Sequence, residues 1–131
     1  MKLLLDTHIW VWSLISPDRL APRVARALAN PANEVWLSPI SVWETMLLLE
    51  RGTIDVDEPA ADWVQQMLRA TPAREAPLTH DVAIESRRVA LSHPDPADRF
   101  LAATARVHEL VLLTGDARLI DAGACDVFDV R

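Results

Sequence analysis

The stretch Lys2-Leu3-Leu4-Leu5-Asp6-Thr7 decides the fold, because three consecutive leucines end abruptly in a carboxylate. A continuous apolar run of this kind predicts a strand buried on both faces, as in a parallel sheet covered by helices. Burying an acid at the end of such a strand is costly unless something binds it. Ligands of open parallel sheets gather at the carboxyl ends of the strands. Asp6 is therefore the first candidate for a ligand-binding residue.

The rest of the chain alternates predicted helices and strands. The expected helices are His8 to Ile15, Ala21 to Ala29, Pro39 to Arg51, Ala60 to Arg69, Asp81 to Leu91, Pro96 to Val107 and Ala117 to Asp121. The further expected strands are Glu34 to Ser38, Leu110 to Thr114 and an edge strand, Val127 to Val130. This alternation predicts a single α/β domain over residues 1–131, with a mainly parallel sheet between two layers of helices.

The composition predicts one domain with a substantial core. The chain has 131 residues, 50% of them hydrophobic, which is enough to fold without disulfides or a structural metal. Cys125 is the single cysteine and has no intramolecular disulfide partner. Because no stretch approaches about 18 uninterrupted apolar residues, we expect a soluble, cytoplasmic protein without a membrane partner.

The net charge of −6 argues against a broad basic surface for binding nucleic acid. Lys2 is the only lysine among the 13 basic residues, and the others are arginines. Arginine clamps phosphate through two hydrogen bonds, so a narrow arginine-lined groove remains compatible with this acidic body. An acidic surface also suits a basic protein partner.

Three more acids lie near the ends of predicted strands or the starts of predicted helices: Glu44, Asp98 and Asp116. If they converge with Asp6, each pair of charges 4 Å apart repels by about 4 kcal/mol at an effective dielectric constant of 20. Such a cluster requires a strong counter-charge. Ligand sets made only of oxygen suit Mg²⁺ or Mn²⁺, and sites of this kind often hydrolyse phosphodiesters.

Each of these three acids also has a structural interpretation. Ser41-Val42-Trp43-Glu44 matches a capping box, in which the glutamate binds a free amide at the start of a helix. Asp98 falls in the first helical turn after Asp95-Pro96, where an acid complements the helix dipole. Asp116 follows Gly115 and suits a turn or a helix cap. Asp6 has no comparable alternative.

Taken in order, four segments resemble the acidic motifs of PIN domains, specifically those of the VapC-type toxin ribonucleases of bacterial toxin–antitoxin pairs. The segments are Leu3-Leu4-Leu5-Asp6-Thr7-His8, Ser41-Val42-Trp43-Glu44, His93-Pro94-Asp95-Pro96-Ala97-Asp98-Arg99 and Leu113-Thr114-Gly115-Asp116. Each motif alone is weak, but together, in this order, they span nearly the whole chain.

This resemblance implies a PIN-like three-layer α/β/α sandwich and a Mg²⁺-dependent endoribonuclease, with Mn²⁺ able to substitute. Asp6, Glu44, Asp98 and Asp116 would be both the metal ligands and the catalytic residues. It also implies an RNA substrate, a small antitoxin that blocks the acidic cleft, and a homodimer.

Five neighbouring residues are candidates for supporting roles. The hydroxyls of Thr7 and Thr114 are candidates for orienting Asp6 and Asp116, although threonine is also ordinary at strand ends. Asp95 is either an outer support of the site or, as we prefer, a helix cap. Arg99 and Arg118 follow motif acids closely and are candidates for RNA phosphate contacts, with a salt-bridged or solvated arginine as the alternative.

The tryptophans are expected to be structural rather than base-stacking residues. Trp10 and Trp12 lie in a helix that is apolar over most of its circumference, which indicates a core position and a subunit interface. Trp36 and Trp43 are expected in the core. The four histidines form no cluster at metal-ligand spacing, and His93 is expected in a loop.

Three other functional classes agree less well with the sequence. A receiver-like phosphoacceptor module would use the same acids at the end of the sheet. Modules of that class need a lysine at the end of a late strand, whereas the only lysine here is Lys2. A PIN-like binding protein without catalysis is a further alternative, against which the presence of all four acids argues. A nucleotide-binding module agrees less well with the sequence than the receiver-like module, because the three glycines form neither a G-x-G-x-x-G motif nor a P-loop.

Overall fold

The computed structural model describes residues 1–92 and 94–131, so the expectation for His93 lies outside the described residues. The strands are β1 (Lys2–Leu5), β2 (Glu34–Leu37), β3 (Arg74–Glu75), β4 (Val111–Thr114) and β5 (Val127–Asp129). The helices are α1 (Thr7–Ile15), α2 (Pro22–Ala29), α3 (Pro39–Glu50), α4 (Ala60–Ala70), α5 (His80–Arg88), α6 (Pro96–Val107) and α7 (Ala117–Ala122), with a 3-10 turn at Pro17–Arg19.

The strands form one parallel sheet in the order β3-β2-β1-β4-β5. Leu4 of β1 pairs with Trp36 on one side and with Leu112 on the other. After β1 the chain adds β2 and β3 on one side of β1, and it later adds β4 and β5 on the other side. This reversal creates a crevice at the carboxyl end of β1, which is the usual ligand position in such sheets.

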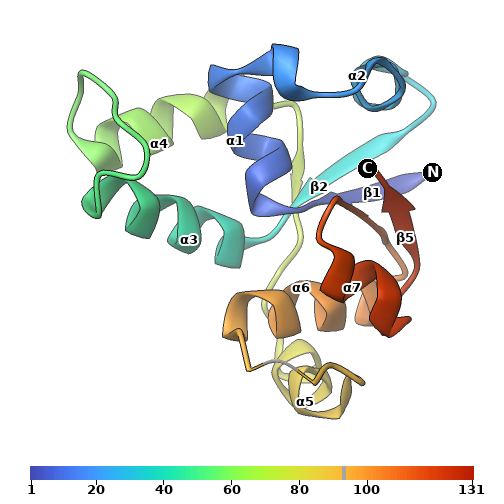
Figure 1. The fold of residues 1–131 in the computed structure, drawn as a ribbon. Helices are drawn as coiled ribbons and strands as arrows, with labels where there is room; N and C mark the ends of the chain where they lie inside the picture. The colour runs from blue at the N-terminus through green and yellow to red at the C-terminus, as the bar shows by residue number, and fades with distance from the viewer. Residues whose placement is uncertain (93) are drawn as a thin grey trace.

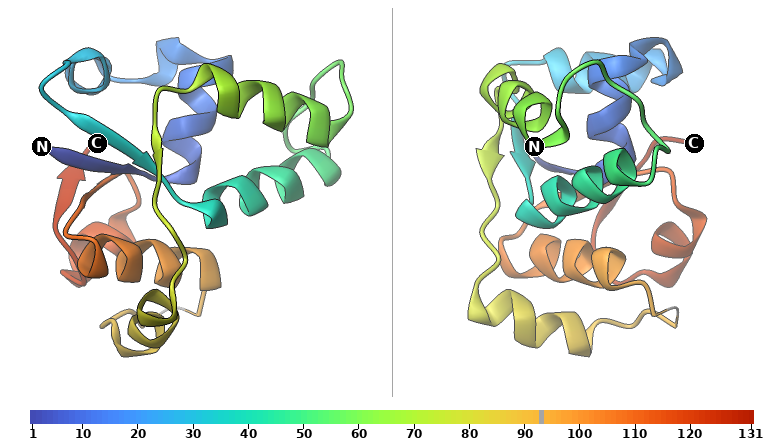
Figure 2. Two further views of the ribbon diagram at one scale, coloured as in Figure 1. Left: turned by 180° about the vertical axis from the view of Figure 1, so that it is seen from behind. Right: turned by 90° about the vertical axis from the view of Figure 1, so that its left-hand side faces the viewer.

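Helices cover both faces of the sheet, as predicted (Figure 1). Helices α1, α2 and α4 lie on one face and α5, α6 and α7 on the other, which is also visible in both views of Figure 2. Leu4 and Leu112 pack into the core beneath α5, α6 and α7, whereas Leu5 and Leu113 pack into the opposite core. The leucine run thus supplies both cores, which explains why it lacks the alternation of a half-exposed strand.

The structure departs from the sequence expectations in a few elements. Strand β3 was not predicted, because its two residues, Arg74 and Glu75, are both exposed and carry no apolar pattern. Helix α5 ends at Arg88 rather than at Leu91, since Val89 already has extended backbone angles. The expectation of a core position for Trp43 is wrong, because 51% of this residue is exposed on α3. Within the described residues, no helix has the length and apolarity needed to cross a membrane.

Candidate functional site

Asp6 lies at the junction of β1 and α1, in the crevice where the chain changes direction. Its amide donates to the carbonyl of Leu113 at 3.1 Å, which continues the pairing of β1 with β4. The hydroxyl of Thr114 donates to Asp6 Oδ2 at 2.6 Å. Only 8% of Asp6 is exposed, and this burial raises the pKa of its carboxyl, while the Thr114 hydrogen bond opposes the rise. The carboxylate is thus held in one orientation at a buried position.

Thr114 ends β4 and joins two of the acids. Besides donating to Asp6, its Oγ1 accepts the backbone amide of Asp116 at 3.1 Å. The predicted contact of Thr114 with Asp116 therefore exists, but through the backbone rather than the carboxylate.

Glu44 reaches the same crevice from the second turn of α3. The capping-box interpretation is wrong, because α3 begins earlier: Ser38 is the N-cap and accepts the Ile40 amide at 3.0 Å. Thr7 Oγ1 lies 3.0 Å from Ser41 Oγ, in a buried hydrogen bond between α1 and α3. Burial raises the pKa of Glu44, and a hydrogen bond with the Thr7 side chain opposes the rise. Thr7 therefore acts on Glu44 through its side chain and on Asp6 through its backbone, whose hydrogen bond opposes the raised pKa of Asp6.

Asp98 lies in the first turn of α6 and is 7% exposed. Burial is the main cause that raises the pKa of its carboxyl to about 7, and the charges of Asp95, Asp6 and Asp116 add to the rise. The cap interpretation of Asp95 is confirmed, since its Oδ1 accepts the Ala97 amide at 3.0 Å. The charge of Arg118, whose Nη2 lies 3.5 Å from Asp98 Oδ2, opposes the rise in the pKa of Asp98.

Asp116 is the N-cap of α7, as its structural interpretation predicted, and it also faces the other acids. Its Oδ1 accepts the Arg118 amide at 2.9 Å, and its Oδ2 lies 3.0 Å from Arg118 Nη2. A Cβ at Gly115, just before it, would lie 3.0 Å from Cγ2 of Val130, so a larger residue there would require the Val130 side chain to shift.

The four predicted acids line one cavity of about 400 Å³. Its walls are Asp6, His8, Ile9, Trp12, Glu44, Asp95, Asp98, Gly115, Asp116 and Arg118. The buried residues Thr7 and Thr114 lie behind the wall and hold two of the acids through the hydrogen bonds described above. Four elements far apart in the sequence thus bring their acids to one place.

Arg99 does not belong to this cavity, and the structure does not support its predicted contact with RNA. Its Nε donates to the carbonyl of Ser86 at 2.9 Å, Nη1 to that of Leu91 at 2.8 Å and Nη2 to that of Val89 at 3.3 Å. The guanidinium is thus used to fasten the end of α5 to the first turn of α6.

The sequence analysis missed three residues of the cavity wall, His8, Ile9 and Trp12. His8 is exposed, and its ring centroid lies 5.9 Å from that of Trp12, one helical turn further along α1. Trp10 is fully buried as predicted, whereas Trp12 is only partly buried and lines the cavity. The signal was available in the sequence: once Asp6 caps α1, residues 8 and 12 follow on the same side of the helix.

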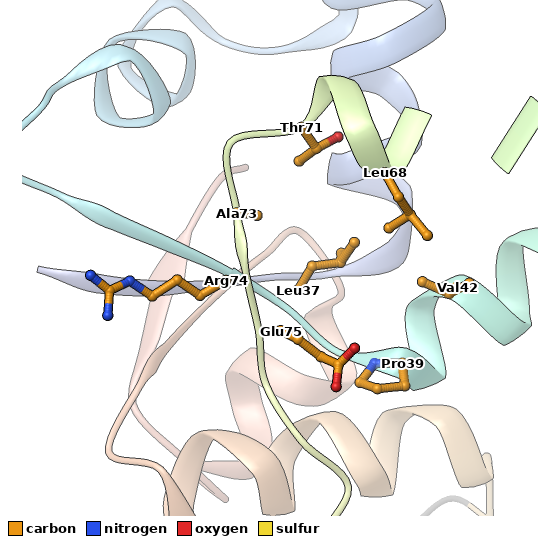
Figure 3. A pocket seen from close by; sticks show the side chains of 8 residues that line it. All are labelled: Leu37, Pro39, Val42, Leu68, Thr71, Ala73, Arg74 and Glu75. Atoms are coloured by element: carbon orange, nitrogen blue, oxygen red, sulfur yellow. The ribbon is translucent and has the colours of Figure 1, made fainter. Parts of the chain in front are cut away.

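A second cavity, of about 360 Å³, lies beside β3 and has different chemistry (Figure 3). Leu37, Val42 and Leu68 give it mostly apolar walls, and Arg74 points away from them. Arg74 instead pairs with Glu34 at 3.3 Å and covers the Trp36 ring. This cavity contains none of the four acids, so the carboxylate-lined cavity is the candidate site.

The residues of the acidic cavity fit a hard divalent cation. Four carboxylates provide an oxygen-only donor set, which Mg²⁺ and Mn²⁺ prefer. Burial and three neighbouring acids raise the pKa of Asp98, and the Arg118 guanidinium lies between Asp98 and Asp116 as a cation. Across residues 1–92 and 94–131, no three acidic, imidazole or thiol groups are already arranged to hold one ion. Binding would therefore draw the carboxylates closer together.

Comparisons with known proteins agree with this geometry. Residues 3–124 match the PIN domain family. The chain is 36% identical over 117 residues to Ribonuclease VapC22 of Mycobacterium tuberculosis (strain ATCC 25618 / H37Rv), an alignment that covers 88% of each protein.

Solved structures show the same fold. VapBC2 from Rickettsia felis, bound to a DNA fragment from its promoter, matches with a TM-score of 0.74 at 14% identity, covering 100% of both chains. FitAcB from Neisseria gonorrhoeae matches with a TM-score of 0.63 at 25% identity, covering 97% of this chain and 96% of the other. The chain therefore belongs to the PIN-domain family, with a VapC ribonuclease among its relatives.

Proposed function

We propose that this protein is a Mg²⁺-dependent endoribonuclease that acts as the toxin of a toxin–antitoxin pair. The observation that carries the proposal is the convergence of Asp6, Glu44, Asp98 and Asp116 on one cavity at the switch point of the sheet. Relatedness to Ribonuclease VapC22 supports RNA as the substrate.

In the proposed mechanism the carboxylates of Asp6, Glu44, Asp98 and Asp116 would hold Mg²⁺, and Mn²⁺ could substitute. When bound, the metal would supply positive charge and a more acidic water for attack on a phosphodiester. The hydrogen bond from Thr114 limits the orientations of Asp6, and the Thr7 side chain lies against Glu44, so less ordering is left when a cation draws the carboxylates together. The chain itself therefore provides a charged cavity and needs no covalent nucleophile.

We further propose a small antitoxin as the partner and a homodimer as the active assembly, in the cytoplasm. A groove of about 390 Å³ shares His8 and Trp12 with the acidic cavity and has apolar walls that include Ile15, Leu48 and Ile54. The acidic cavity at one end of this groove and the net charge of −6 suit a basic, amphipathic segment that blocks access to the acids. The solved neighbours include one described as a member of the VapBC family of toxin–antitoxin systems and one described as a toxin–antitoxin complex, which supports the same pairing.

The receiver-like alternative is weaker in this fold. Lys2, the only lysine, is exposed at the amino end of β1, whereas Asp6 follows the carboxyl end of the same strand. No lysine can therefore accompany the acids as that mechanism requires.

Cleavage of RNA by the purified protein tests the proposal. We expect Mg²⁺-dependent cleavage that EDTA abolishes, and Asp6→Asn should lose more than the roughly 10- to 100-fold typical for an outer partner of a metal ligand. Asp18→Asn, which changes an exposed acid in the 3-10 turn, is the matched control and should cleave like the parent. Full activity in EDTA, or an unaffected Asp6→Asn variant, would refute the proposed site. Growth arrest without the antitoxin, relieved by Asp6→Asn at equal abundance, tests the toxin role.

A further inference from the structure

Arg118 is a cation built into the acidic cavity. Its Nη2 lies 3.0 Å from Asp116 Oδ2 and 3.5 Å from Asp98 Oδ2. The Nε and the backbone amide of Arg118 donate to the other carboxylate oxygen, Asp116 Oδ1, at 3.3 Å and 2.9 Å. One guanidinium therefore joins an acid from α6 to the acid that caps α7.

A second Asp-x-Arg segment in the chain shows which of these contacts are merely local. Arg131 binds Asp129 in the same way, with its amide at 2.9 Å and Nη2 at 2.9 Å from the carboxylate oxygens. The pairing within each segment is therefore a property of the turn. What distinguishes Arg118 is its additional ion pair with Asp98, and no corresponding second carboxylate pairs with Arg131 among the described residues.

We propose that Arg118 is an internal counter-cation that competes with the divalent metal for Asp98 and Asp116 and thereby sets the metal affinity of the site. This inference rests on the proposed function. The guanidinium and a metal cannot both lie against the same carboxylate oxygens without strong repulsion. Arg118 must therefore leave when the metal enters.

The position of Arg118 makes this displacement feasible. Its side chain is 59% exposed, so it can turn toward solvent without opening the core. Exposed ion pairs are weak, which means that the competition lowers metal affinity without preventing binding. A displaced Arg118 remains anchored beside the mouth of the cavity, where its guanidinium is free to bind an RNA phosphate.

Titration calorimetry with Mn²⁺ tests the competition directly. Arg118→Gln should bind Mn²⁺ roughly three- to tenfold more tightly than the parent, the range that one or two exposed ion pairs supply. Arg118→Lys, which keeps the charge but not the planar fork, should fall between them. Arg131→Gln is the matched control and should bind like the parent. The difference should shrink at high salt, because exposed charges are screened.

Thermal melting supplies a second readout that a merely structural role would not produce. In EDTA, Arg118→Gln should melt below the parent, because Asp98 and Asp116 lose a counter-charge. In saturating Mn²⁺ it should melt at or above the parent. Two outcomes would refute the role of Arg118 without touching the metal site. One is that Arg118→Gln loses the same amount of melting temperature in EDTA and in Mn²⁺. The other is that the parent binds Mn²⁺ and Arg118→Gln binds it with the same affinity. A parent that binds no Mn²⁺ would overturn this inference together with the proposed metal site.

Discussion

Replacing Asp98 by asparagine should stabilise the metal-free protein while it abolishes function. Asp98 is 7% exposed, and its pKa is raised from an ordinary 3.8 to about 7, mainly by burial and then by the neighbouring acids. The folded state therefore holds this proton more tightly than the unfolded chain does. The stability associated with the protonated form is complete below about pH 4 and is lost as the pH rises through 7.

The size of the effect follows from the pKa. A pKa difference of one unit corresponds to about 1.4 kcal/mol, so the ionised carboxylate lowers the free energy of unfolding by about 4 kcal/mol above neutral pH. The amide also loses the Arg118 ion pair, and we expect a net gain of about 2 to 4 kcal/mol for Asp98→Asn at pH 8. In a domain of 131 residues this raises the melting temperature by roughly 6 to 15 °C.

The assay is a set of thermal melts of the two proteins at pH 5 and pH 8, each in EDTA and in Mn²⁺. In EDTA the difference in stability between the parent and Asp98→Asn should fall by more than half from pH 8 to pH 5, because Asp98 of the parent takes up a proton. In Mn²⁺ the parent should gain about 2.7 kcal/mol at 100 times the dissociation constant, and the variant much less. Metal should thus narrow or reverse the order of stability.

Asp81 offers a matched control, because it lies in the first turn of α5 as Asp98 lies in the first turn of α6, but it is exposed. Asp81→Asn should cost about 0.3 to 1 kcal/mol in every condition through the helix dipole. If Asp98→Asn behaves in the same way, with a metal-independent loss of stability at pH 8, Asp98 is only a helix-terminal charge. The electrostatic account of the cavity would then be refuted.

Two further substitutions separate orientation of the acids from support of the fold. Thr114→Val keeps the side-chain shape but removes the 2.6 Å hydrogen bond to Asp6, so the pKa of Asp6 should rise further. Mn²⁺ affinity measured by calorimetry should fall by about 10- to 100-fold; unchanged affinity would show that Thr114 only completes the strand. Arg99→Gln leaves three backbone carbonyls at the end of α5 without their guanidinium donors and should cost about 1 to 3 kcal/mol in urea unfolding. That loss should be equal in EDTA and Mn²⁺, and a metal-dependent loss would place Arg99 in the site after all.

The positions of the acids were predictable from the sequence because the sheet itself is predictable. All of Leu3 to Leu5 can be buried only in a strand that has a core on each face. Parallel strands of this kind place their carboxyl ends at a common edge of the sheet. Asp6 and Asp116 follow two of those ends, and their proximity is a consequence of β1 pairing with β4. The proximity of Asp6 to Asp116 thus depends on the order of the strands and not on side-chain contacts.

Other features depend on tertiary packing that local sequence does not encode. Strand β3 exists because Arg74 and Glu75 pair with β2, although neither residue carries a strand signal. Arg99 could equally have faced solvent, and its direction is set by free carbonyls at the end of α5. The capping-box pattern at Glu44 was misleading because Ser38, three residues before Ser41, provides the actual N-cap.

The separate anchoring of the acids explains why the repulsion in the cavity persists. Asp6 is tied to β4 through Thr114, and α3, which carries Glu44, is tied to α1 through the contact of Thr7 with Ser41. These contacts are buried and belong to the packing of the cores, so no single loop can move to separate the charges. The free energy of folding therefore holds the carboxylates together, and their repulsion is relieved either by a proton, as at Asp98, or by a cation. In the metal-free protein Arg118 is one such cation, and exchanging it for a divalent ion relieves the repulsion more fully than a single exposed guanidinium does.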